Sequence, residues 1–148
     1  MTEQEIRKGL NGVVADYTAV SKVNPETNSL LYRGYPVQEL AEHCTFEEVA
    51  YLLWNGELPN EEQMAEFRGG CMENRDIDEK LIQVINFMPK DCHPMDVLRT
   101  AVSYLGAEDA EKFTPDSDHL RGIGRKLLAK LPTIVATDIR RRQGKEYI

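Results

Sequence analysis

Two adjacent pairs of histidine and cysteine, His43-Cys44 and Cys92-His93, carry side chains that can bind a metal ion. Imidazole nitrogens and thiolates are the ligands that zinc prefers, and the two pairs together would supply four of them. Neighbouring residues chelate one ion poorly, however, and this spacing matches no known zinc arrangement. We therefore predict no metal site. Both cysteines are interpreted as small buried apolar residues, and His93 as the cap of a helix.

Three consecutive arginines, Arg140, Arg141 and Arg142, form the one basic cluster of the sequence. A guanidinium group presents its donors in a fork that fits phosphate oxygens, so the cluster could bind a phosphate. The alternative is a solvated helix end, where cations balance the negative pole of the helix dipole. On the residues alone, this second interpretation is favoured.

The sequence contains none of the short motifs that identify a reaction. It has no glycine-rich phosphate loop, no G-x-S-x-G, no H-E-x-x-H and no C-x-x-C. A net charge of −7 disfavours binding to nucleic acid and to anionic lipid. The residues by themselves therefore assign no reaction and no bound cofactor.

The composition is typical of a soluble globular protein, with 41% hydrophobic and 29% charged residues. No apolar run reaches the roughly 18 residues of a membrane-spanning helix, and residues 1–8 are polar, unlike a signal peptide. Three cysteines without paired spacing predict reduced thiols and no disulfide. We expect a cytoplasmic protein in which residues 1–148 form one domain.

The elements that would position these residues are mostly helices. Residues 13–35 are rich in β-branched side chains around a turn at residues 24–28, which predicts a hairpin. Tyr32, Arg33 and Tyr35 surround Gly34 and are interpreted as a packed corner after this hairpin. The predicted helices cover residues 36–42, 45–54, 61–72, 78–88, 94–105, 115–131 and 132–143.

Capping residues and prolines set these helix boundaries. Thr45 begins a capping box with Glu48, Asn60 repeats the pattern, and Asp76 or Asp78 can cap the helix after it. The last three helices begin at a proline, the residue favoured in a first helical turn: Pro94, Pro115 and Pro132. Gly144 is available to end the last one. The predicted fold class is all-α with a small N-terminal β-hairpin.

Several runs of residues together resemble the opening of citrate synthases. They are residues 29–35 (SLLYRGY), residues 46–59 (FEEVAYLLWNGELP), His93-Pro94-Met95-Asp96, Leu131-Pro132 and the arginine cluster with Gly144. They follow the family's order and approximate spacing over nearly the whole chain, and residues 95–106 look most like 2-methylcitrate synthases. The resemblance implies the N-terminal part of the large domain of this family.

The resemblance also implies a reaction. Citrate synthases are two-domain, mainly helical homodimers that condense oxaloacetate with an acyl-CoA, here propionyl-CoA or acetyl-CoA, through a carbanion. Their catalytic aspartate and two histidines belong to later motifs, and none of His43, His93 and His119 lies in a matching one. We therefore assign no catalytic residue and expect this chain alone to be inactive. The alternative is a helical interaction or assembly module on the same scaffold.

Two binding roles are implied by position. Arg141 or Arg142 stands where relatives place an arginine that contacts the phosphate of coenzyme A, the thioester co-substrate. Relatives tend to carry a basic residue late in the helix after Leu58-Pro59, where this sequence has Gly69-Gly70, so Arg68 is the nearest substitute for binding substrate. Such a glycine pair costs a helix about 1 kcal/mol per residue relative to alanine.

The helices at residues 94–105 and 115–131 are expected to expose apolar side chains in the isolated chain. In the family they pack against later helices and against the second subunit. The residues concerned are Leu98, Val102, Leu105, Leu120, Ile123, Leu127, Leu128 and Leu131. We predict that the chain buries them by self-association into a symmetric dimer.

Overall fold

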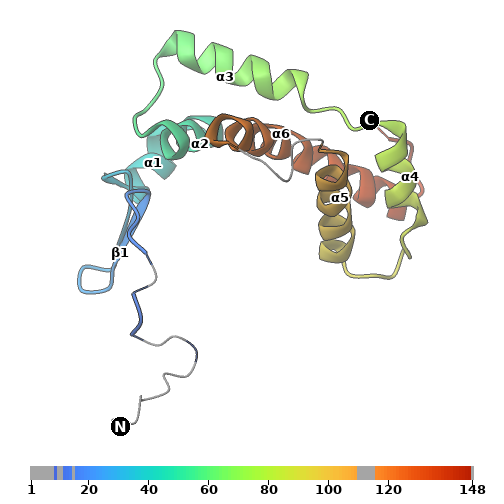
Figure 1. Ribbon diagram of the computed structural model, residues 1–148, viewed down its shortest axis with the longest axis horizontal. Helices are drawn as coiled ribbons and strands as arrows, with labels where there is room; N and C mark the ends of the chain where they lie inside the picture. The colour runs from blue at the N-terminus through green and yellow to red at the C-terminus, as the bar shows by residue number, and fades with distance from the viewer. Residues whose placement is uncertain (1–8, 10–11, 15, 110–115, 148) are drawn as a thin grey trace. The chain divides into compact units, whose positions relative to one another are not determined.

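The structure, a computed structural model, describes residues 9, 12–14, 16–109 and 116–147 of the chain. In these residues three short strands precede six helices, which confirms the predicted fold class (Figure 1). Contacts group the chain into two compact units, Met1–Met64 and Ala65–Ile148, and the single domain expected from the sequence stays a prediction. Each unit is described by itself.

The first unit begins with a small antiparallel sheet in the order β1-β2-β3. Strands β1 (Ser21–Asn24) and β2 (Ser29–Tyr32) pair around the turn that the sequence predicts, in which the Asn24 side chain accepts the N–H of Glu26. Strand β3 (Tyr35–Pro36) pairs with the other edge of β2. The strands are shorter than the predicted hairpin over residues 13–35, because the described residues before Ser21 form no strand.

Helices α1 (Val37–His43) and α2 (Phe46–Asn55) follow the sheet. Thr45 and Glu48 form the predicted capping box, in which each side chain accepts the backbone N–H of the other. Arg33, in the turn between β2 and β3, donates to the Leu53 carbonyl from Nε at 3.2 Å and Nη2 at 2.8 Å. Because the last carbonyls of a helix lack partners within it, Arg33 caps α2. Tyr32 is half-buried but Tyr35 is exposed, so the predicted packed corner forms only in part.

Helix α3 (Glu61–Glu73) contains the Gly69-Gly70 pair without interruption. Its first turn is fixed by Asn60 and Gln63, whose side chains each accept the other's backbone N–H at 2.9 Å. Its buried side chains are spaced along one face of a helix: Met64, Phe67 and Cys71. One buried stripe therefore keeps the segment helical despite the two glycines.

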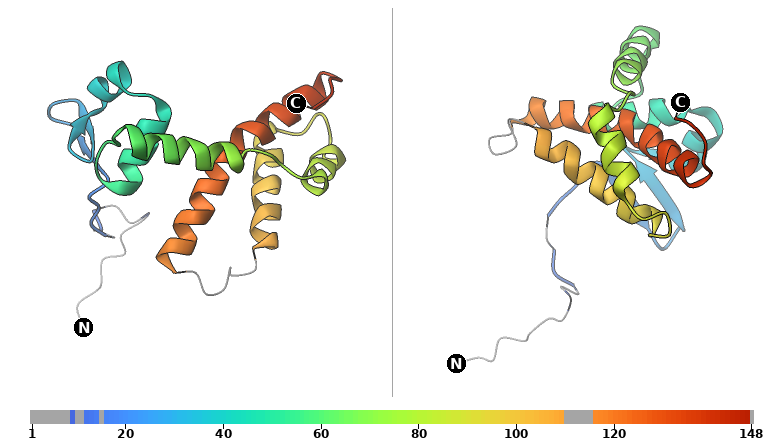
Figure 2. Two further views of the ribbon diagram at one scale, coloured as in Figure 1. Left: turned by 90° about the horizontal axis from the view of Figure 1, so that it is seen from above. Right: turned by 90° about the vertical axis from the view of Figure 1, so that its right-hand side faces the viewer.

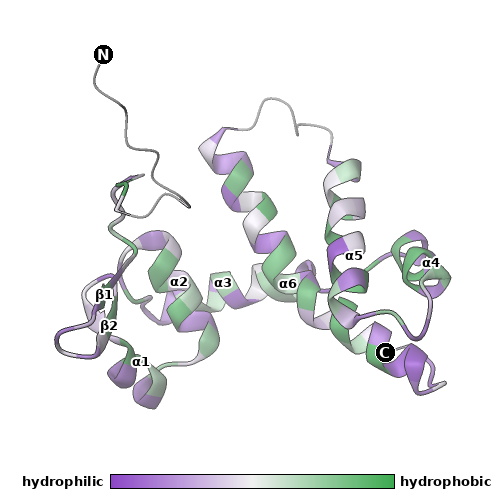
Figure 3. Cartoon of the chain, turned by 90° about the horizontal axis from the view of Figure 1, so that it is seen from below, coloured by the Kyte–Doolittle hydropathy of each residue, from purple (hydrophilic) through white to green (hydrophobic). Residues whose placement is uncertain are grey.

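The second unit is built on helices α4 (Glu79–Phe87), α5 (Pro94–Glu108) and α6 (Ser117–Arg142), which contact one another (Figure 2). Apolar and polar residues alternate along each of them, as amphipathic helices require (Figure 3). Their apolar faces meet in one core cluster, made of Leu81, Ile85, Val97, Ala101 and Ile134.

The caps of α4 and α5 are predicted residues, whereas Asp116, the cap of α6, was not predicted. Asp78 accepts the N–H of Leu81 at 2.8 Å, and the Nδ1 atom of His93 accepts the N–H of Met95 at 3.2 Å. Asp116 caps α6. The predicted start at Pro115 lies outside the described residues. His93 thus has the capping role that the sequence indicates.

The structure has one helix, α6, where the sequence predicts separate helices at residues 115–131 and 132–143. Pro132 lies inside α6, on an exposed position, and its ring nitrogen cannot donate to the carbonyl one turn earlier. The residues that α6 buries on both sides of Pro132, from Ala129 to Arg141, make one continuous buried face. Burial of that face outweighs the lost hydrogen bond, so the helix continues.

Helix α6 ends as predicted at Gly144. Its φ of 68° is in the left-handed region, which glycine adopts without steric cost. The N–H of Gly144 donates to the Arg141 carbonyl, and that of Lys145 to the Arg140 carbonyl, the pair of bonds of a Schellman motif. No helix in the described part of the chain is long and apolar enough to cross a membrane.

Candidate functional site

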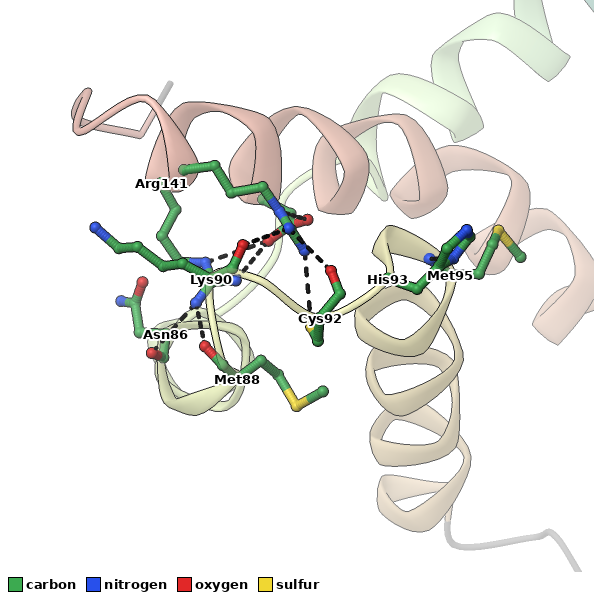
Figure 4. A network of polar contacts seen from close by, with 9 residues as sticks. Asn86, Met88, Lys90, Cys92, His93, Met95 and Arg141 are labelled. Atoms are coloured by element: carbon green, nitrogen blue, oxygen red, sulfur yellow. Dashed lines mark hydrogen bonds and ion pairs between the residues drawn. The ribbon is translucent and has the colours of Figure 1, made fainter.

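The arginine cluster lies in the last turn of α6, and two of its members, Arg141 and Arg142, face the linker between α4 and α5 (Figure 4). Asp138 lies one turn earlier, and its Oδ1 atom accepts hydrogen bonds from Arg141 at 3.2 Å (Nε) and 2.7 Å (Nη2). Arg141 Nη1 donates to the carbonyls of Met88 at 2.5 Å and Asn86 at 3.4 Å. Both carbonyls lie at the end of α4, so Arg141 caps that helix.

Arg142 binds the other side of the same carboxylate. Its Nε atom donates to Asp138 Oδ2 at 2.7 Å. Its Nη1 atom donates to the carbonyls of Lys90 at 2.6 Å and Cys92 at 3.0 Å, and Nη2 contacts the Cys92 sulfur at 3.7 Å. Cys92 directly precedes the cap of α5. Arg142 therefore holds the backbone that leads into this helix.

Burial makes this arrangement costly to break, because a partner left alone would be a buried charge. The side chains of Asp138 and Arg141 are each 6% exposed, and that of Arg142 is 22% exposed. The hydrogen bond that Arg142 donates to Asp138 raises the pKa of Arg142, so the guanidinium remains a cation. One carboxylate faces two cations, and backbone carbonyl dipoles supply the remaining negative potential.

Of the two interpretations weighed from the sequence, the structure bears on the solvated helix end. The cluster is not a solvated helix end, because Arg141 is buried. The donors described above face acceptors of the protein itself, and Arg142 retains more exposure than Arg141. Binding of a coenzyme A phosphate by either residue stays a prediction.

Sequence analysis did not single out Asp138. The signal was present, because a carboxylate three and four residues before two arginines shares their helical face. That spacing is common on exposed helix surfaces, where such pairs contribute little. Asp138, Arg141 and Arg142 form a triad that differs from such surface pairs only in its burial.

Among the other sequence candidates, Cys92 contacts Arg142, as described above. Arg68 is exposed on α3. His43 is paired at 3.9 Å with the exposed Glu42, and Cys44 is half-buried beside it. Across the described residues, no group of three or more histidine, cysteine or acidic side chains could hold a metal ion.

A groove of about 660 Å³ lies between α5 and α6. Its apolar lining includes Val102, Leu105, Leu120, Ile123 and Leu127. At its rim, the Nε2 atom of His119 lies 3.0 Å from Asp109 Oδ2. Leu120 is 54% exposed, whereas Leu98 and Leu105 pack against the core cluster. The groove is an apolar surface with a polar rim, suited to contact with another apolar surface.

The comparison with protein families assigns the chain. The family described as citrate synthase, C-terminal domain, matches residues 9–148. The chain belongs to the citrate synthase family. This assignment agrees with the resemblance carried by residues 29–35, 46–59 and 93–106.

Three relatives within the citrate synthase family illustrate the match. The chain is 59% identical over 147 residues to 2-methylcitrate synthase 2 of Corynebacterium glutamicum, covering 99% of this chain and 38% of that protein. It is 57% identical over 146 residues to a citrate synthase of Mycolicibacterium smegmatis, covering 97% and 39%. It is 53% identical over 140 residues to a 2-methylcitrate synthase of Mycobacterium tuberculosis, which covers 95% of this chain and 35% of that protein. The chain thus spans about two fifths of the length of these relatives.

Solved citrate synthases share the fold. The enzyme from Thermotoga maritima is 34% identical with a TM-score of 0.82, covering 97% of this chain and 37% of that one. A Thermoplasma acidophilum citrate synthase, in complex with carboxymethyl coenzyme A and oxaloacetate, has a TM-score of 0.89 at 23% identity, covering 97% and 38%. At that identity the second likeness concerns the fold alone.

Proposed function

We propose that these residues form part of the large domain of a 2-methylcitrate or citrate synthase, an acyltransferase that condenses propionyl-CoA or acetyl-CoA with oxaloacetate. The observation that carries the proposal is 59% identity over 147 residues to a 2-methylcitrate synthase, together with the family match over residues 9–148. Citrate synthase itself remains the alternative parent activity, because a protein of that name is 57% identical. The expected location is the cytoplasm.

The role proposed for these residues is structural support and ligand contact. No residue of the chain is proposed as catalytic, so the chain alone is expected to be inactive. For the coenzyme A phosphate we propose Arg142 rather than Arg141, because its side chain is 22% exposed against 6%. Arg68, exposed on α3, is the proposed substrate contact.

Release of free coenzyme A tests the proposal. The purified chain is incubated with propionyl-CoA and oxaloacetate, and the new thiol is measured against a blank without oxaloacetate, since Cys44, Cys71 and Cys92 also carry thiols. We expect no release. Adding the part of the C. glutamicum 2-methylcitrate synthase 2 that the chain does not cover should then produce oxaloacetate-dependent release. Release by the chain alone, or association of the two parts without any release, would contradict the proposal.

Assembly as a homodimer is the second part of the proposal. The supporting observation is the open apolar groove between α5 and α6, whose lining residues are among those predicted to be exposed. An interaction module without catalysis would use the same groove. The two functions differ in the mixing experiment, because an interaction module binds the complementary part without producing coenzyme A.

A further inference from the structure

The linker between α4 and α5, residues 88–93, is held mainly by polar contacts. Pro89, Lys90 and Asp91 are exposed, and Met88 and Cys92 pack only partly against the core cluster. Its backbone N–H bonds are local and long: Met88 to the Ile85 carbonyl at 3.2 Å, and Cys92 to the Pro89 carbonyl at 3.4 Å. Little apolar burial therefore keeps this segment in place.

The carbonyls of the linker are held by the two arginines of α6. The buried Arg141 donates a hydrogen bond to the carbonyl of Met88. The more exposed Arg142 donates to the carbonyls of Lys90 and Cys92. Both guanidinium groups are oriented by Asp138, which accepts from each. The two arginines differ in exposure. The hydrogen bonds of Arg142 lie nearer to solvent than those of Arg141, and they hold the more exposed part of the linker.

We propose that residues 90–93 form a strap that opens as a unit while the α4–α5–α6 core stays folded, and that Arg142, oriented by Asp138, is its fastener. The strap ends at His93, the cap of α5. Opening releases the carbonyls of Lys90 and Cys92 to water and removes the guanidinium from the Cys92 sulfur. Access to this thiol therefore reports the open state.

The test is the rate of alkylation of Cys92 by N-ethylmaleimide in the full chain, followed by peptide mass spectrometry. Arg142→Lys keeps the positive charge near the thiol but loses the fork that spans two carbonyls and a carboxylate, so a faster rate reports access. We expect the alkylation rate of Cys92 to rise by about tenfold, the effect of losing a charge-assisted hydrogen bond. Buried Cys71 is the internal reference and should keep its rate.

Two further variants complete the experiment. Asp138→Asn should also raise the alkylation rate of Cys92, because Arg142 loses the carboxylate that orients it. Arg99→Lys is the matched control, since Arg99 forms an exposed pair with Asp96 at 3.0 Å on α5, and it should leave Cys92 unchanged. An unchanged Cys92 rate in Arg142→Lys would overturn the proposal. Equal acceleration of Cys71 and Cys92 would also overturn it, because the opening would then be that of the whole unit.

Discussion

Asp138 and Arg141 form an ion pair in the interior of the second unit, with Oδ1 and Nη2 2.7 Å apart and both side chains 6% exposed. They lie one turn apart on α6, yet the guanidinium reaches across to the carbonyls at the end of α4. The pair therefore joins α6 to the end of α4, whose two carbonyls belong to residues 55 and 53 positions before Arg141. Interactions of this kind make the loss of one partner costly, because the other remains buried and charged.

Replacing Asp138 by alanine should lower the free energy of unfolding by about 3–5 kcal/mol, since it leaves Arg141 without its carboxylate and releases Arg142. Urea unfolding followed by circular dichroism measures the change. Asp96→Ala is the control, because Asp96 pairs with Arg99 on an exposed surface and should cost about 1 kcal/mol or less. Equal losses in the two variants would show that the triad is not a stability centre.

Replacing Gly69 by alanine should stabilise the chain by about 0.5–1 kcal/mol. Gly69 is inside α3, has helical neighbours and no atom within 4 Å of the position that a Cβ would take. The matched control is Gly56→Ala, which should destabilise, because Gly56 ends α2 with a φ of 94°. A stability loss in Gly69→Ala would indicate that the glycine pair serves a close contact.

Replacing Pro132 by alanine should raise stability by about 1–3 kcal/mol, because alanine supplies an N–H inside α6 and favours the helix. The position is exposed, so little packing is lost. Thermal unfolding measured by circular dichroism tests the prediction. An unchanged or lower midpoint would mean that α6 is built around a bend at Pro132.

Local signals in the sequence predict much of this fold. The capping box at Thr45, the paired Asn60 and Gln63, the cap at His93 and the end at Gly144 depend on neighbouring residues only, and all four are confirmed. The proline signal failed at Pro132 for a physical reason. A proline that begins a helix and one inside a helix look alike in sequence, and only the burial on both sides of it decides.

The candidate site was less predictable. The sequence drew attention to the arginines but not to Asp138, because spacing on a helix does not reveal burial. The acceptors of Arg141 and Arg142 are backbone carbonyls of residues 86–92, which carry no sequence signature. Likewise, Leu98 and Leu105 were predicted to be exposed together with Leu120. Only Leu120 is, at 54%, because Leu98 and Leu105 pack against the core cluster.

Self-association through the groove between α5 and α6 is the last prediction. We expect the chain to sediment as a dimer at micromolar concentration, and Leu120→Ser to raise the dissociation constant at least about tenfold, since each large apolar side chain left unburied costs about 1.5–3 kcal/mol. Phe87→Ser is the matched control: Phe87 is 88% exposed at the end of α4 but does not line the groove, so its loss should leave association unchanged. A wild-type chain that is monomeric, folded by circular dichroism and unable to bind a hydrophobic dye would show that the groove needs no cover, and equal effects of the two substitutions would show that association is not specific to it.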